Sequence, residues 1–291
     1  MKKPLPDRNS FLKYKSALNE SNFMVLPVPY EQTTSYGSGT RNGPDAIIKA
    51  SHHLEVFDEE YGIEPYREGI HTLEPIAFEK NPMELSIEKI YKTVKALPVR
   101  DKFLISLGGE HSITYPIVRA FRKSFKQICV LHVDAHTDLR ESYEGTVYSH
   151  GSVMARLKDM VDIVQVGIRS QSREEYDLIK KYGIRTFYMH TIRNDSMWME
   201  HVAESLGDTV YVTIDLDGFD PSVAPGVGTP EPGGLLWYDV IDLIRLITKR
   251  KHVIGCDIVE LAPVPGSIIT DFLAAKLAYK IIGNLIINRH I

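Results

Sequence analysis

The sequence predicts an α/β protein in which helices cover both faces of a parallel β-sheet. From residue 103 onward, short apolar runs alternate with segments whose apolar residues recur at helical spacing. The runs are almost continuously apolar, as in strands that are buried on both faces. No internal repeat and no linker-like break interrupts this pattern, so we expect a single domain over residues 1–291.

Apolar runs bounded by turn-forming residues predict the strands. The first run is interrupted and ended by prolines, Pro27 and Pro29. The first twenty residues are polar and predict irregular structure or a short helix, whereas residues 55–76 are ambiguous and fit a short strand or two among loops. The expected strands lie at residues 22–29, 103–107, 128–134, 163–168, 184–189, 210–215 and 253–258.

The helices carry boundary signals as well as apolar periodicity. Pro44 stands in the first turn of a helix that follows a loop rich in Thr, Ser and Gly at residues 32–44. Gly183 stands where a glycine commonly ends a helix. The expected helices begin at residue 43 and cover residues 85–97, 112–123, 149–160, 173–182, 197–206, 238–249 and 268–287.

Composition excludes several classes of protein. A net charge of -4 argues against a nucleic-acid binder, which would show a basic footprint. No apolar run is long enough for a membrane span, and no apolar segment follows the basic start as in a signal peptide. Cys129 and Cys256 lie in apolar runs, as small buried residues do in a reducing compartment. We therefore expect a cytoplasmic protein that binds neither nucleic acid nor a membrane.

Acidic and histidine side chains follow four of the expected strands. Because ligands bind outside the carboxyl ends of parallel strands, these side chains should meet at one edge of the sheet. After residue 133 they occupy every second position, which places three of them on one face of an extended chain. The side chains are those of His111, of Asp134, His136 and Asp138, of Asp215 and Asp217, and of Glu260.

The charges of this cluster predict two metal ions. Two histidines and four aspartates give six ligands and four negative charges, which two divalent cations would balance. Without cations, carboxylates packed so closely would raise one another's pKa values. Oxygen-rich ligation with one imidazole for each ion favours manganese over zinc. Two such ions sharing a water would make hydroxide available near neutral pH, which predicts a hydrolase.

The ordered motifs resemble those of the ureohydrolases, the arginase and agmatinase family. The resemblance implies a three-layer α/β/α domain around an eight-stranded parallel sheet, two Mn²⁺ ions, and hydrolysis of a guanidino group to urea and an amine. A loop at residues 37–44 is also similar to the family. The motifs are Gly108-Gly109-Glu110-His111, Asp134-Ala135-His136-Thr137-Asp138, Ser149-His150-Gly151, Asp215-Leu216-Asp217-Gly218-Phe219-Asp220-Pro221 and Glu260-Leu261-Ala262-Pro263.

The resemblance also implies a role for each site residue. A metal-bridging hydroxide would attack the guanidinium carbon, and Asp138 is placed to accept its remaining proton. His150 matches a mobile histidine that would protonate the departing amine, a task that suits an imidazole. Glu260 matches the acid that holds the substrate guanidinium, which a carboxylate fits in shape and charge. The metal ligands fall on His111, Asp134, His136, Asp138, Asp215 and Asp217.

The stretch at residues 139–145 bears on the substrate. It lacks the Asn-rich pattern with which arginases hold the amino-acid end of arginine, and it carries Glu141 and Glu144. Negative charge there would repel an α-carboxylate, so agmatine, cleaved to urea and putrescine, is the expected substrate. Arg140 could act in the opposite sense. Arginine, guanidinobutyrate and formimidoyl compounds therefore stay open as substrates of the same site.

Two other classes of protein deserve comparison. A related fold that hydrolyses acetylated amines on a single zinc ion would not need four aspartates beside His111. A binding protein that had kept only the fold would be expected to have lost a ligand, His150 or Glu260, and all are present. The resemblance further implies a homo-oligomer, a trimer or hexamer, and exposed aromatic residues such as Tyr61, Tyr66 and Trp198 are weak candidates for its interface.

Overall fold

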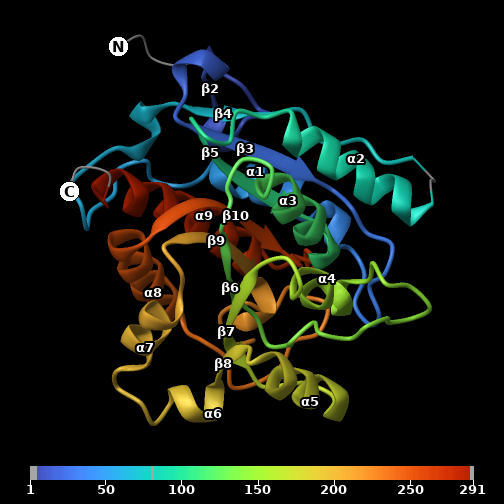
Figure 1. Cartoon of the computed structure of the whole chain (residues 1–291). Coiled ribbons are helices and arrows are strands. Elements are labelled where there is room, and N and C mark those ends of the chain that lie inside the picture. The colour runs from blue at the N-terminus through green and yellow to red at the C-terminus, as the bar shows by residue number, and fades with distance from the viewer. Residues whose placement is uncertain (1–4, 80–81, 289–291) are drawn as a thin grey trace.

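A computed structural model describes residues 5–79 and 82–288, and its centre is an eight-stranded sheet in which all neighbouring strands are parallel. The strand order is β4-β3-β5-β10-β9-β6-β7-β8, which runs from top to bottom of Figure 1. The strands are β3 (Phe23–Val28), β4 (Ile70–Thr72), β5 (Phe103–Gly108), β6 (Cys129–Val133), β7 (Asp162–Ile168), β8 (Arg185–Tyr188), β9 (Thr209–Asp215) and β10 (His252–Val259). The fold class predicted from the sequence is confirmed.

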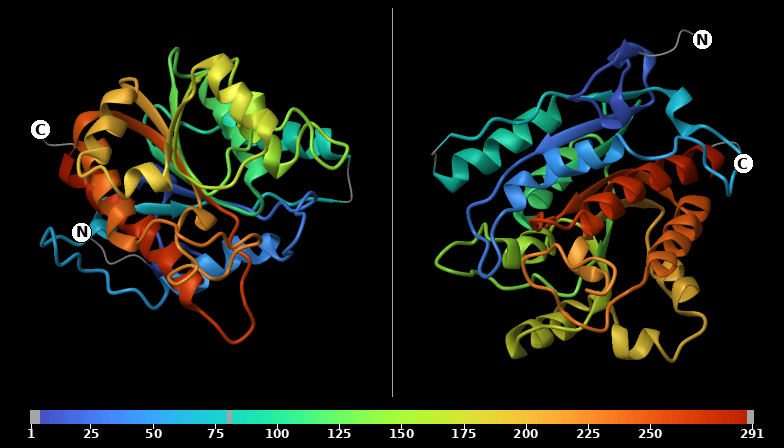
Figure 2. Two further views of the ribbon diagram at one scale, coloured as in Figure 1. Left: turned by 90° about the horizontal axis from the view of Figure 1, so that it is seen from below. Right: turned by 180° about the vertical axis from the view of Figure 1, so that it is seen from behind.

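Helices form a layer on each face of the sheet (Figures 1 and 2). The layer that packs around α9 contains α1, α6, α7, α8 and α9, and the opposite layer contains α2, α3, α4 and α5. The bounds are α1 (Gly43–Ser51), α2 (Met83–Lys95), α3 (Thr114–Phe121), α4 (Val153–Leu157), α5 (Arg173–Tyr182), α6 (Met189–Ile192), α7 (Trp198–Ser205), α8 (Trp237–Arg250) and α9 (Ile269–Asn288).

The core has two parts, one between the sheet and each helical layer. Successive residues of β5 illustrate the division, since Phe103 and Ile105 pack on the α9 side and Leu104 packs on the other. This alternation explains the continuous apolar runs, because both faces of each central strand are buried. Helix ends follow their sequence signals: Ser172 and Glu175 form a capping box at the start of α5, and Gly183 ends it with φ of 66°.

Several local expectations change in detail. The N-terminal region forms a small antiparallel pair, β1 (Leu5–Pro6) and β2 (Tyr14–Lys15), with short 3-10 turns. The ambiguous region at residues 55–76 contributes one edge strand, β4. The helix expected at residues 149–160 is shorter, because a 3-10 turn at His150–Ser152 precedes α4.

Trp198 was expected to be exposed but is 8% exposed and belongs to the core beside α7, so it is not an interface candidate. Both cysteines are buried and free, as expected. Among the described residues, no helix is both long and apolar enough to cross a membrane.

Candidate metal centre

Four adjacent strands, β5, β10, β9 and β6, end at the same place and carry the expected residues there. His111 opens a 3-10 turn (His111–Ile113) three residues after the end of β5, and Asp217 lies in another (Leu216–Gly218) directly after β9. Asp215 is the last residue of β9, and Asp134, His136, Asp138 and Glu260 follow their strands within five residues. The sheet thereby brings together residues from four distant parts of the chain.

One group of side chains surrounds Nδ1 of His111. Carboxylate oxygens of Asp134 and Asp138 each lie 3.1 Å from this nitrogen, and an oxygen of Asp215 lies 3.4 Å away. The nitrogen is buried and has no hydrogen-bond partner among the described residues. A buried nitrogen without a partner, faced by three carboxylates, is the arrangement expected around a divalent cation. The donor set therefore fits a metal ion.

A second group surrounds Nδ1 of His136. This nitrogen lies 3.0 Å from Oδ2 of Asp217 and 3.6 Å from Oδ1 of Asp134. Asp134 belongs to both groups, with Oδ2 toward His111 and Oδ1 toward His136. The structure thus presents two neighbouring sets of metal-binding atoms that share one carboxylate.

Hydrogen bonds from backbone amides hold the carboxylates of Asp215 and Asp217 in these orientations. Oδ1 of Asp215 accepts from the amide of Asp217 at 2.8 Å, and Oδ1 of Asp217 accepts from the amide of Ala135 at 3.1 Å. Their other oxygens face the histidines. Burial, followed by the charges of Asp217 and Asp134, raises the pKa of Asp215 well above its usual range. Such mutual repulsion is what bound cations would relieve.

Hydrogen bonds also set the orientation of His111. Its Nε2 lies 2.8 Å from the hydroxyl of Thr213, which in turn donates to Asp257 at 2.5 Å. Because that hydroxyl gives its proton to a carboxylate, it accepts from His111, and the neutral ring keeps its lone pair on Nδ1. Asp257 is fully buried and also accepts from the hydroxyls of Thr114 and Tyr211. Sequence reasoning missed Thr213 and Asp257, although Thr213 lies two residues before Asp215 on the same strand, β9.

Glu260 and Asp138 share an unusual backbone conformation. Their φ angles are 65° and 52°, in the left-handed region that non-glycine residues seldom occupy. Oε1 of Glu260 accepts from the amide of His111 at 2.6 Å, so its second oxygen is free of that bond. Burial, with the charge of Glu110, raises the pKa of Glu260 well above its usual range. Strain at these two residues supports a functional role for both.

His150 lies beside the loop that follows β3. Its amide donates to the hydroxyl of Thr33 at 3.1 Å, and its ring nitrogens Nδ1 and Nε2 lie 3.3 Å from Thr33 and 3.5 Å from Ser35. A cavity of about 20 Å³ connects it with the metal-binding groups. The lining residues are Thr34, Ser35, Tyr36, Gly37, His111, Asp138, His150, Asp215, Asp217, Gly228, Thr229 and Glu260.

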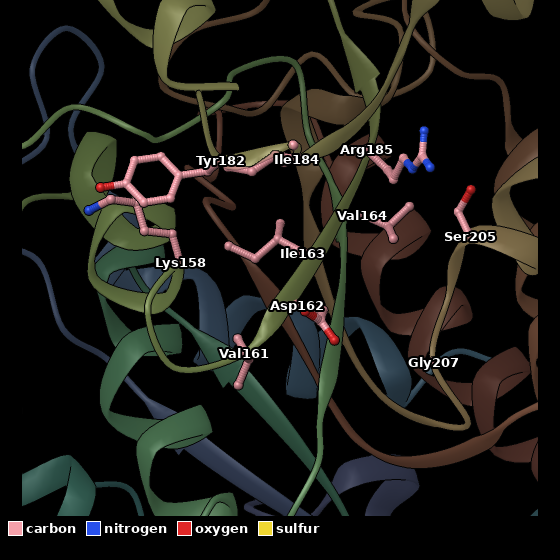
Figure 3. Close-up of a pocket in the computed structure, with 11 residues that line it drawn as sticks. Lys158, Val161, Asp162, Ile163, Val164, Tyr182, Ile184, Arg185, Ser205 and Gly207 are labelled. Carbon is pink, nitrogen blue, oxygen red and sulfur yellow. The ribbon is translucent and has the colours of Figure 1, made fainter. Parts of the chain in front are cut away.

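A larger cavity, of about 220 Å³, lies at the opposite edge of the sheet, where β7 and β8 begin. Figure 3 shows Lys158 and Tyr182 side by side at one end of it, with Arg185 and Ser205 at the other. The Lys158 ammonium is already paired with Glu141 at 2.9 Å. None of the candidate site residues lines this cavity, so its greater size does not make it the catalytic site.

The stretch at residues 139–145 does not contribute to the lining of the smaller cavity. Glu141 forms ion pairs with Arg156 at 2.7 Å and Lys158 at 2.9 Å. The charge of Glu141, which suggested repulsion of an α-carboxylate, is therefore largely neutralised by its own neighbours. The ring of Tyr143 instead packs edge-on against His150, with centroids 5.6 Å apart.

Comparison with known proteins agrees with this geometry. Residues 21–283 match the model of the arginase family. The chain is 40% identical to an N(1)-aminopropylagmatine ureohydrolase of Synechocystis over 89% of this chain and 88% of the relative. It is 35% identical to an agmatinase of Pyrococcus horikoshii over 91% and 93% of the two chains. The crystal structure of an agmatine ureohydrolase of Thermoplasma volcanium superposes with a TM-score of 0.86 at 33% identity, covering 100% of this chain and 97% of that one. The chain therefore belongs to the arginase family and is a ureohydrolase.

Proposed function

We propose that this ureohydrolase uses two divalent metal ions to hydrolyse the terminal guanidino group of a linear polyamine, releasing urea and a free amine. The observation that carries the proposal is the position of Asp134, whose two oxygens face two different histidines. Within the set of six ligands, His111, Asp138 and Asp215 would complete one metal site, and His136 and Asp217 the other. Manganese is the proposed ion, because the donors are mostly oxygen with one imidazole for each ion.

Two divalent ions held by these residues would lower the pKa of a water molecule to near neutral, so that it would lose its first proton to solvent. The side chains of the protein perform the remaining tasks. Glu260 binds the guanidinium with the oxygen that His111 does not engage, and the positive charge of the substrate favours its ionised form. The oxygen of water adds to the guanidinium carbon, Asp138 accepts the remaining proton, and the bond from carbon to the substituted nitrogen breaks. His150 protonates the leaving amine.

The lining of the cavity supports a cationic substrate. Of its four acidic side chains, Asp138, Asp215 and Asp217 would hold the metal ions and Glu260 stays available to a cation, and no lysine or arginine is among its described residues. An α-carboxylate such as that of arginine would thus find no basic partner there. Agmatine, the substrate expected from the sequence, carries an amine instead.

The comparisons favour N(1)-aminopropylagmatine over agmatine itself. The relative that bears this name is 40% identical, whereas the agmatinase described above is 35% identical. N(1)-aminopropylagmatine has the same guanidino end but carries two ammonium groups on a longer tail. We therefore propose it as the preferred substrate, with agmatine as the second candidate.

Parallel assays of urea release test the proposal. Manganese-loaded protein should release urea from N(1)-aminopropylagmatine with the highest kcat/KM, from agmatine with a lower value, and from arginine or guanidinobutyrate hardly at all. Protein treated with a chelator should be inactive until metal is restored. Preferred hydrolysis of arginine would contradict the substrate assignment while leaving the metal chemistry intact, and activity without metal would contradict both. Trimeric or hexameric assembly and a cytoplasmic location stay predictions.

A further inference from the structure

His132 is a buried histidine at the metal centre that the proposed reaction does not use. It lies on β6 and is 0% exposed. Its Nε2 lies 2.7 Å from Oδ2 of Asp134. The donor atoms of four side chains lie close enough together to hold one ion, and these are His111, His132, Asp134 and Asp138. Distance alone therefore makes His132 a potential seventh ligand.

The neighbouring strand determines which nitrogen of His132 carries the proton. Gln165 on β7 pairs with His132 in the sheet register. Its Nε2 lies 2.7 Å from the carbonyl oxygen of Thr137 and 3.0 Å from Nδ1 of His132, while its Oε1 lies 3.1 Å from the hydroxyl of Thr186. A carbonyl oxygen can only accept, so the amide nitrogen of Gln165 faces Thr137 and its second hydrogen points to His132.

This donor count leaves one arrangement for a neutral ring. Nδ1 of His132 accepts from Gln165, so the single proton is on Nε2 and is donated to Asp134. We infer that His132 is a positioning residue, a hydrogen-bond donor to the shared carboxylate rather than a metal ligand, and that Gln165 keeps it in this tautomer. The inference rests on the proposed function only in treating Asp134 as a ligand of both ions.

The consequence for Asp134 is that each oxygen has one fixed donor. Oδ2 accepts from His132 at 2.7 Å, and Oδ1 accepts from the amide of His136 at 2.6 Å. Each oxygen retains a lone pair on the side of its metal-binding group. The carboxylate cannot rotate without breaking one of these bonds, so it stays aligned with both sites.

Two substitutions distinguish whether His132 acts as a hydrogen-bond donor or as a metal ligand. In His132→Gln, the side-chain amide nitrogen takes the place of Nε2 and can still donate to Asp134, but it cannot replace an imidazole as a ligand. In His132→Leu, both functions are lost. Titration calorimetry with Mn²⁺ should show two ions bound for each chain in both variants. Affinity should remain near that of the wild type for Gln and fall about 10- to 100-fold for Leu.

A measurement on the unaltered protein keeps the test independent of variant folding. Nitrogen-15 NMR of the metal-free protein, with labelled histidine, should show His132 with Nδ1 unprotonated and Nε2 protonated. Gln165→Glu should protonate Nδ1, whereas Thr186→Val, which leaves the Gln165 donor in place, should not. Equal loss of affinity in both His132 variants, loss of one bound ion, or a proton on Nδ1 in the wild type would overturn the inference. If the wild type bound no metal, the proposed function would fail instead, and the tautomer would be unaffected.

Discussion

The hydroxyl oxygen of Thr33 lies 3.3 Å from Nδ1 of His150, and its own proton is committed to Glu110 at 2.7 Å. Glu110 is fully buried and also accepts from the amide of Thr33 at 2.6 Å. Since the hydroxyl can then only accept from His150, the neutral imidazole carries its proton on Nδ1. In the proposed mechanism, Nε2 would therefore be the nitrogen that takes up a proton and passes it to the leaving amine.

Replacing this hydroxyl should impair proton delivery. In Thr33→Val, which has nearly the same shape, His150 loses the acceptor that orients it, and kcat should fall by about 10-fold or more, within the range of general acid catalysis. KM and manganese content should change little, because Thr33 lines neither metal group. Thr33→Ser keeps the hydroxyl and should restore most of the lost rate. A valine variant with the kcat of the wild type would show that His150 needs no such support.

Glu260 should act mainly on substrate binding. Glu260→Gln replaces the free carboxylate oxygen with an amide, which loses a hydrogen bond to a charged group worth about 1.5–3 kcal/mol. KM for the guanidino substrate should therefore rise about 10- to 100-fold. The amide oxygen can still accept from His111, so metal content should not change. Steady-state kinetics with elemental analysis checks both expectations, and an unchanged KM would exclude Glu260 from the guanidinium site.

Asp138→Asn should remove activity and leave the fold. An amide cannot accept the proton of the attacking water, so the rate should fall by about 100-fold or more. Asn tolerates the left-handed conformation of this position, where φ is 52°, at least as well as Asp does. Circular dichroism and thermal unfolding should therefore match the wild type at equal metal loading. Full turnover by this variant at normal manganese occupancy would contradict the role of Asp138.

Metal binding should compete with protons. Burial opposes the charge of His136, yet its bonds with Asp134 and Asp217 raise its pKa to about 12 in the metal-free protein. A metal ion must displace this proton, so apparent affinity should increase with pH and binding should release protons. Calorimetry in two buffers with different ionisation enthalpies measures the release. An affinity that is constant between about pH 6 and pH 9 would contradict this expectation.

The sequence was sufficient to predict features that depend on local residue patterns. Continuous apolar runs predicted the main strands because both faces of the central strands are buried, and the rule of carboxyl ends brought His111, Asp134 and Asp215 to one edge. In the structure, carboxylate oxygens of Asp134 and Asp215 lie 3.1 Å and 3.4 Å from Nδ1 of His111. The positions of these residues at the ends of strands were therefore enough to predict that they meet.

The supporting residues could not be found in this way. His132 depends on Gln165, and Thr213 depends on Asp257, in each case across neighbouring strands that are more than 30 residues apart in the chain. Such pairs are visible only when the strand order is known. Glu141 shows the opposite kind of error. Its negative charge suggested a role in substrate selection, but ion pairs with Arg156 and Lys158 largely neutralise that charge.

The position of β10 affects the order in which the site is assembled during protein synthesis. It is the last strand of the sheet in the chain, yet it lies between β5 and β9 and is the link that joins their two halves of the sheet. His111 and Asp215 are therefore brought face to face only once the chain has been made past Val259. A nascent chain shorter than this lacks the group around His111, whereas Asp134, His136 and Asp217 follow β6 and β9, which pair directly without β10. The two groups of metal-binding side chains therefore become complete at different stages of synthesis.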